Sequence, residues 1–200
     1  MYPFVEFLAG ALFLGTLFSF GLTLHTLFYT AFIFSLIVIT FIDLEHLIIP
    51  NVISYPGILV GLIFNALITD WPLAGKAIDY LRADYSSILA VIVQVPILDS
   101  LFGVILGGGI LLLIAYSYEK LRGREGMGMG DVKLLAMIGA FLGIQGVVFV
   151  ILVSSILGTV VGLSMILLQK GDFKYALPFG PFLSIAAVVY IFTGGFRVNL

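Results

Sequence analysis

Two aspartates, Asp43 and Asp131, stand where apolar runs of the sequence give way to short polar connections. Asp131 follows the glycine-rich stretch Gly126–Gly130 and precedes an apolar run that begins at Leu134, whereas Asp43 ends an apolar run shortly before Pro50. Two carboxylates that share a site cannot both ionise easily, so one holds a proton while the other accepts one. Such a pair can activate a water as base and protonate a leaving amine as acid, which is what peptide hydrolysis requires.

Each aspartate also has a structural interpretation. Asp131 can cap the helix that follows the glycines, because an Asp side chain accepts hydrogen bonds from early helical N–H groups. Lys133 can pair with Asp131 simply to neutralise its charge. Asp43 can be an ordinary residue at the point where a membrane span ends. The positions of the surrounding elements must therefore distinguish a shared site from two unrelated carboxylates.

The composition predicts an integral membrane protein. Of the 200 residues, 62% are hydrophobic and only 10% are charged, whereas soluble domains are roughly a quarter charged. Several runs reach the ~18 apolar residues that cross a bilayer as a helix, and the hydrocarbon admits only helices or closed barrels. The absence of cysteine excludes disulfides, thiolate nucleophiles and Cys-ligated zinc. We expect an all-α polytopic membrane helix bundle.

The apolar runs predict about seven transmembrane helices, with six or eight as alternatives, in one domain covering residues 1–200. The expected spans are 4–20, 27–42, 51–69, 100–118, a short span after Asp131 that breaks near Gly143–Gly146, then 147–168 and 177–194. Residues 70–87 are expected to form an extracytoplasmic loop and residues 119–131 a cytoplasmic glycine-rich loop. We interpret residues 88–98 as interfacial or re-entrant, and the glycine run 107–109 as a close helix contact or kink.

The basic residues predict the orientation of the bundle. Two connections, which this topology places on one side of the membrane, carry most of them: Lys120, Arg122, Arg124, Lys133, Lys170 and Lys174. Basic connections face the cytoplasm, so Asp43 and Asp131 are expected to share the cytoplasmic face. Asp99 falls at the opposite boundary and is not expected to join the pair. An ionisable group near the hydrocarbon marks a functional site by default.

Three ordered segments resemble the type IV prepilin peptidases, which are membrane aspartic proteases with a GxGD motif. Gly128-Met129-Gly130-Asp131 matches that motif and continues through Gly143 as the family does. Ile42–Asn51 resembles the family's other aspartate segment, and Leu177–Phe182 resembles its last cytoplasmic turn. The likeness covers about residues 20–187.

The resemblance implies a peptidase that removes the basic leader of type IV prepilins or pseudopilins at the cytoplasmic face of the bacterial inner membrane. It implies Asp43 and Asp131 as the catalytic pair and a water between them, without metal, cofactor or nucleic-acid partner; membrane lipid surrounds the protein, and no oligomeric state is indicated. Residues expected to bind substrate or shape the loop are Gly128, Gly130, Lys133, Glu45 and Pro50. Bifunctional family members also carry a region with a cysteine zinc tetrad, so methyl transfer is not expected from this cysteine-free sequence.

Charge suggests how a basic leader is attracted, because opposite charges steer encounter. The acidic residues expected to do so are Glu45, Glu119, Glu125 and Asp172. Two other classes of protein remain as alternatives. A proton-coupled transporter or channel also uses intramembrane carboxylates and glycine-broken helices, and a non-catalytic scaffold of a secretion or pilus machine would not need the carboxylates at all.

Overall fold

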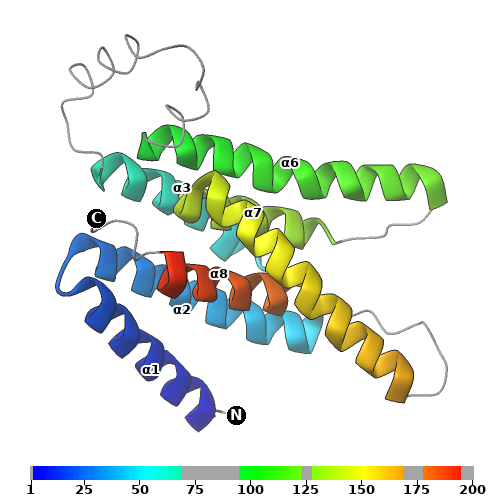
Figure 1. Cartoon of the computed structure of the whole chain (residues 1–200), viewed down its shortest axis with the longest axis horizontal. Coiled ribbons are helices and arrows are strands. Elements are labelled where there is room, and N and C mark those ends of the chain that lie inside the picture. The colour runs from blue at the N-terminus through cyan, green and yellow to red at the C-terminus, as the bar shows by residue number, and fades with distance from the viewer. Residues whose placement is uncertain (1, 69–94, 123–127, 169–177, 195–200) are drawn as a thin grey trace.

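The computed structural model describes residues 2–68, 95–122, 128–168 and 178–194, and every regular element in these ranges is an α-helix. The helices, shown in Figure 1, are α1 (Tyr2–Phe20), α2 (Leu24–His46), α3 (Asn51–Ile68), α6 (Pro96–Arg122), α7 (Met129–Leu168) and α8 (Gly180–Gly194). Five of them, all except the shorter α8, are long and apolar enough to cross a membrane. The expected all-α membrane bundle is confirmed.

Helix α7 consists of two parts that run in different directions (Figure 1). Gly143 interrupts it with φ 67° and ψ −168°, a conformation that glycine adopts without steric cost. We call residues 129–142 the first half and residues 144–168 the second half. The predicted break near Gly143–Gly146 is confirmed, and the described residues thereby form seven helical segments, as the apolar runs predict.

Polar side chains from α3 and α6 hold this reversal. Asp99 Oδ1 accepts a hydrogen bond of 2.9 Å from the N–H of Ile144, so it caps the second half of α7 from a different helix. The carbonyl of Ala140, in the last turn of the first half, accepts bonds from the Ser100 hydroxyl at 2.7 Å and the Asn65 amide at 2.9 Å. Asp99 therefore lies about 18 Å along the first half of α7 from Asp131, at the rise of 1.5 Å per residue.

The first half of α7 forms the centre of the bundle. All residues from Leu134 to Leu142 are buried, as expected for a helix that is apolar on every side. Glycines let α6 approach it closely: a Cβ at Gly107 would lie 2.6 Å from the carbonyl oxygen of Leu135, and a Cβ at Gly103 would collide with Gly139. The interpretation of residues 107–109 as a close helix contact is confirmed for Gly107.

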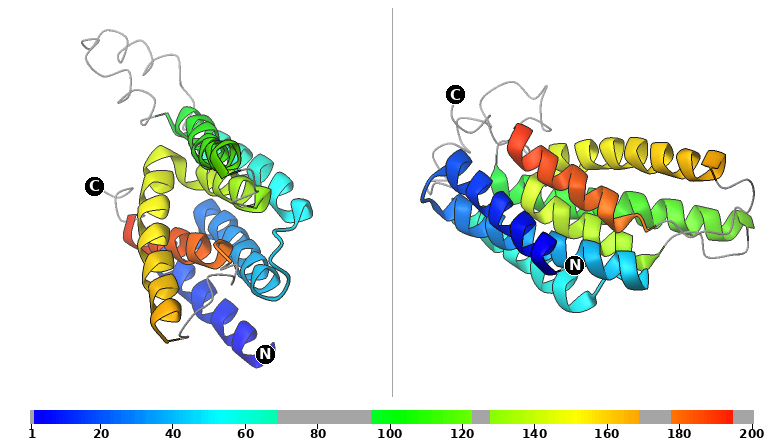
Figure 2. Two further views of the ribbon diagram at one scale, coloured as in Figure 1. Left: turned by 90° about the vertical axis from the view of Figure 1, so that its right-hand side faces the viewer. Right: turned by 90° about the horizontal axis from the view of Figure 1, so that it is seen from below.

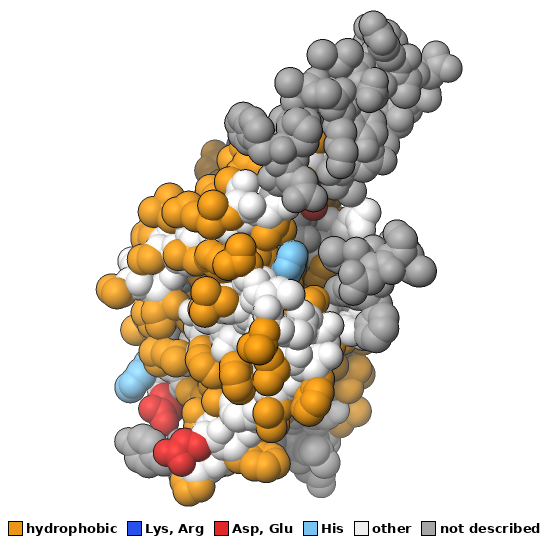
Figure 3. Space-filling view, turned by 90° about the vertical axis from the view of Figure 1, so that its left-hand side faces the viewer, with side chains coloured by type: hydrophobic (Ala, Val, Ile, Leu, Met, Phe, Trp, Pro, Cys, Tyr) orange, Lys and Arg blue, Asp and Glu red, His pale blue; other side chains and the backbone are white. Residues whose placement is uncertain are grey.

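The two further views in Figure 2 show that α6 and the second half of α7 project on the same side of the bundle. The outer surface is apolar: hydrophobic side chains cover much of the face shown in Figure 3, and few charged side chains interrupt them. Helix α1 is the least enclosed of the five long helices, because only 6% of the residues in its apolar stretch are buried. Phe7 and Phe18, which are 75% and 86% exposed, suit a helix that faces lipid.

Two predicted boundaries differ from the structure. The loop expected at residues 119–131 is shorter, because α6 continues through Arg122 and α7 begins at Met129; Glu, Lys and Arg are good helix formers that extend a span into water. Pro96–Leu98, expected to be interfacial or re-entrant, form the first turn of α6, where proline is well tolerated. The predicted loop 70–87, residues 88–94, Arg124, Glu125, Lys170, Asp172 and Lys174 lie outside the described residues.

Candidate active site

The side chain of Asp43 is buried at the end of α2. Only 5% of this residue is exposed. The helix ends one turn later, where Leu47 adopts the left-handed conformation with φ 55° and ψ 34° and its N–H bonds to the Asp43 carbonyl oxygen at 2.9 Å. This conformation is uncommon outside glycine, and it turns the chain sharply after Asp43.

The first residue of α8 binds the Asp43 carboxylate. The N–H of Gly180 donates a hydrogen bond of 3.0 Å to Asp43 Oδ2. The first N–H groups of a helix have no partner within the helix, and the helix dipole favours negative charge at this end. A Cβ at position 180 would lie 2.6 Å from the same oxygen, so glycine is required for this close approach.

Asp131 lies in the first turn of α7, not at the position before it that a capping side chain occupies. Its N–H bonds to the Gly128 carbonyl oxygen at 3.2 Å, and the residue is half-buried. Its carboxylate is close enough to that of Asp43 for the two charges to interact. The structure therefore brings together the two aspartates that the sequence predicts as a pair.

A buried isoleucine connects the two aspartate segments. Ile49 is 6% exposed and packs against the glycine before Asp131, because a Cβ at Gly130 would lie 2.8 Å from its own Cβ. A Cβ at Gly180 would lie 3.4 Å from Ile49 Cδ1. One side chain from the α2–α3 connection thus occupies the space beside both glycines of the site.

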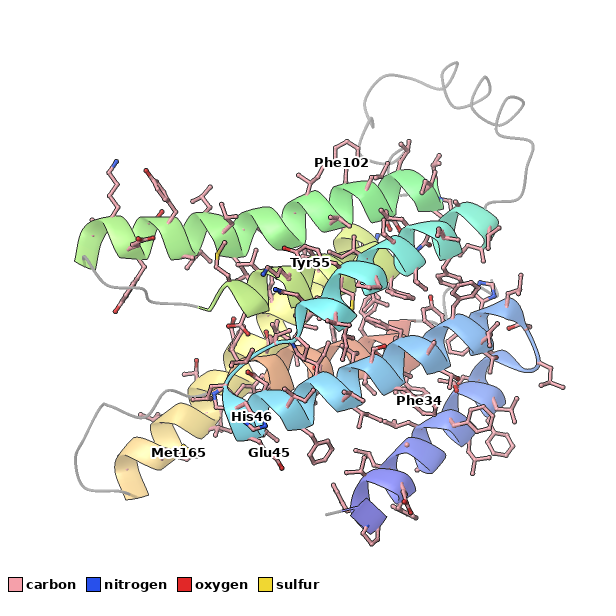
Figure 4. All side chains as sticks on the ribbon, turned by 180° about the vertical axis from the view of Figure 1, so that it is seen from behind. Phe34, Glu45, His46, Tyr55, Phe102 and Met165 are labelled. Carbon is pink, nitrogen blue, oxygen red and sulfur yellow. The ribbon has the colours of Figure 1, made fainter. Side chains whose placement is uncertain are left out.

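Lys133 is bound to α3. Its ammonium donates to Asn51 Oδ1 at 2.8 Å and lies 5.3 Å from the centre of the Tyr55 ring; Figure 4 shows Tyr55 on α3. Asn51 is exposed, so this bond is at the surface of the bundle. The ammonium therefore joins the starts of α7 and α3, and the partner it binds is Asn51 rather than the Asp131 carboxylate.

The other predicted site residues lie around this pair. Gly128 is exposed next to Asp131. The carbonyl of Pro50 accepts the Ser54 N–H at 3.2 Å and thereby starts α3. Glu45 is exposed and lies beside His46 at the end of α2 (Figure 4), with its Oε2 atom 4.0 Å from His46 Nε2.

The arrangement offers two carboxylates, a backbone donor to one of them and an apolar wall. Within the part of the chain that the structure describes, no group of three or more His, Asp or Glu side chains is placed to hold a metal ion. Paired carboxylates of this kind can act on a water as acid and base.

Two contributors to the site are absent from the sequence-based prediction. The Gly180 N–H could have been suspected, because Gly180 lies between Pro178 and Pro181, which have no N–H to offer. Ile49 carries no comparable signal, since Leu47, Ile48 and Ile49 form one apolar run and only the fold distinguishes them.

Comparison with known proteins identifies the family. The type IV leader peptidase family matches residues 30–163. Proteins named prepilin leader peptidase/N-methyltransferase are similar to this chain: that of Aeromonas salmonicida is 32% identical over 193 residues, 96% of this chain and 58% of the relative. That of Pseudomonas aeruginosa is 32% identical over 194 residues, again 96% and 58%, and that of Neisseria gonorrhoeae is 34% identical over 195 residues, 96% and 57%.

The chain thus spans somewhat more than half the length of these curated relatives. No solved structure matches it. The match to the family covers well over half of the chain and includes both aspartates of the candidate site. The chain therefore belongs to the type IV leader peptidase family.

Proposed function

We propose that this protein is an aspartic endopeptidase that removes the leader peptide from type IV prepilins or pseudopilins, with Asp43 and Asp131 as its catalytic pair. The observation that carries the proposal is the meeting of these two carboxylates at one end of the bundle, around Ile49 and the N-terminus of α8. The names of the relatives supply the substrate class. The proposal is limited to the peptidase reaction.

The mechanism uses a water between the two carboxyl groups. The unprotonated carboxylate removes a proton from the water, whose oxygen attacks the carbonyl carbon of the scissile bond. The protonated carboxyl stabilises the developing oxyanion, and a proton then passes to the nitrogen as the C–N bond breaks. The Gly180 N–H holds Asp43 in one orientation throughout.

The proposed location is the bacterial inner membrane, with the site near its cytoplasmic face. Helix α6 ends and α7 begins at the end of the bundle that holds both aspartates (Figure 1), and Lys120 and Lys133 lie there. Basic residues beside span ends favour the cytoplasmic side. At this end Glu45 and Glu119 are exposed, and we propose that they attract the basic leader.

The decisive experiment is cleavage of a model prepilin by the purified protein in liposomes, with wild type compared with Asp43→Asn and Asp131→Asn. General acid–base groups contribute about 10²- to 10⁴-fold, so each folded single variant is expected to lose at least that much of the cleavage rate. Cleavage that survives either change removes that aspartate from the mechanism. If wild type cleaves nothing, proton flux into the same liposomes distinguishes a transporter from a non-catalytic scaffold.

A further inference from the structure

We propose that Ile49 is a positioning residue, whose buried side chain sets the separation between the two carboxylates. The consequence for cleavage rests on the proposed function, whereas the geometric part does not. No chemistry is assigned to Ile49 itself; it acts by filling the space between the segments that carry Asp43 and Asp131.

The turn after α2 directs this one side chain inward. Leu47 and Ile48 are 53% and 64% exposed, whereas Ile49 is 6% exposed. The left-handed conformation of Leu47 ends the helix, and Pro50 favours an extended backbone at the residue before it. Ile49 is therefore the member of this apolar run that enters the bundle.

The contacts of Ile49 lie beside both aspartates. Its Cβ fills the place next to Gly130, which immediately precedes Asp131, and its Cδ1 reaches the place next to Gly180, whose N–H binds Asp43. A β-branched side chain has few χ1 rotamers, so it acts as a stiff spacer between the two glycines.

A spacer is needed here because the carboxylates do not fix their own separation. Two ionised carboxylates repel each other, and a shared proton joins a carboxyl pair only at direct hydrogen-bond distance, which leaves no place for a water between them. Acid–base catalysis through a single water requires a fixed distance, and a misplacement of about 1 Å can cost 10²-fold in rate. When a core side chain is shortened, the surroundings relax only partly into the cavity, so the two segments would be held less firmly.

The test uses the absence of cysteine from the sequence. We would prepare the Asp43→Cys/Asp131→Cys double variant of the full chain in liposomes and measure cross-linking by oxidation and by thiol-reactive linkers of increasing length. The same measurement follows with Ile49→Val, which removes only Cδ1, with Ile49→Ala, and with Ile191→Ala. Ile191 is a matched control because it is 3% exposed near the far end of α8. Cleavage kinetics are measured in parallel for the three isoleucine variants that retain both aspartates.

We expect Ile49→Ala to shift the linker length that reacts fastest and to lower kcat by about 10- to 100-fold with KM nearly unchanged. Ile49→Val is expected to fall between Ile49→Ala and the parent, and Ile191→Ala to match the parent in both measurements. An unchanged linker profile in Ile49→Ala overturns the proposal, whatever happens to the rate. If even wild type shows no cleavage, the proposed peptidase function fails, while a shifted profile still supports the spacing role of Ile49.

Discussion

Replacing Gly180 by alanine is the sharpest single test of how the candidate site is built. A Cβ at this position would lie 2.6 Å from Asp43 Oδ2 and 3.2 Å from Asp43 Cγ. Ordinary van der Waals contact begins near 3.4 Å, so the carboxylate oxygen must retreat by about 0.8 Å. The hydrogen bond from the Gly180 N–H, now 3.0 Å long, would then be lost or badly stretched.

The expected cost follows from the kind of bond that is lost. A hydrogen bond to a charged group contributes about 1.5–3 kcal/mol, and each 1.36 kcal/mol is a factor of ten in rate. If the bond from Gly180 orients Asp43 during the reaction, Gly180→Ala should lower kcat by about 10- to 150-fold. The backbone of α8 itself can accept alanine there, because Gly180 does not have a positive φ.

The assay is cleavage of a model prepilin in liposomes, with thermal unfolding in detergent measured on the same preparations. Gly109→Ala is the matched control, because a Cβ at this glycine of α6 would meet nothing within 4 Å. The reasoning is refuted if Gly180→Ala cleaves at the wild-type rate. It is equally refuted if Gly109→Ala loses as much activity, since the loss would then not depend on the contact with Asp43.

Three further changes test the neighbouring contacts. Gly130→Ala places a Cβ 2.8 Å from the Cβ of Ile49 and should lower the cleavage rate by about 10- to 100-fold. Gly128→Ala comes no closer than 3.9 Å to Asp131 Oδ2 and should stay within a few-fold of the wild-type rate. Equal losses in the two variants would contradict the steric argument. Lys133→Met and Asn51→Ala each break the 2.8 Å hydrogen bond between α7 and α3. The double variant should therefore cleave no more slowly than the less active single variant. Additive losses in the cleavage rate would mean that Lys133 acts through another contact. Asp99→Ala removes the cap of the second half of α7 and should destabilise the protein to thermal unfolding by about 1 kcal/mol; Asp99→Asn keeps an acceptor and should lose less, and equal losses would point to the charge.

The sequence predicts the meeting of the aspartate segments for a topological reason. Each aspartate ends or begins an apolar run, and a chain that crosses a membrane repeatedly returns to the same side after every second span. Two spans, α3 and α6, separate Asp43 from Asp131, so counting spans places both aspartates on the same side of the membrane. Placing the last turn, which leads into α8, on that side also requires the break at Gly143. Without that break, which the φ of 67° establishes, the long run after Asp131 would count as one span and the last turn would fall on the opposite side.

The contacts that complete the site could not be predicted in the same way. The prolines around Gly180 reduce the number of backbone donors there, but every other residue offers an N–H, so no residue type shows which of them reaches Asp43. In the sequence, Asp99 looks like an ordinary polar residue at the end of a span. Its partner, the Ile144 N–H, becomes available only because the chain reverses 44 residues later, at Gly143. Such contacts depend on backbone geometry between distant segments, which hydropathy does not encode.

The two glycines that approach the aspartates have a common physical role. At each of them a neighbouring side chain occupies the place that a Cβ would fill: Ile49 at Gly130 and the Asp43 carboxylate at Gly180. The backbone before Asp131 and the backbone that binds Asp43 can therefore both come close to the α2–α3 connection. A glycine needed only for flexibility would tolerate alanine wherever space allows, as at Gly128. The steric argument instead makes Gly130 and Gly180 necessary because of what lies beside them, and it makes the size of the side chain at position 49 part of the same constraint.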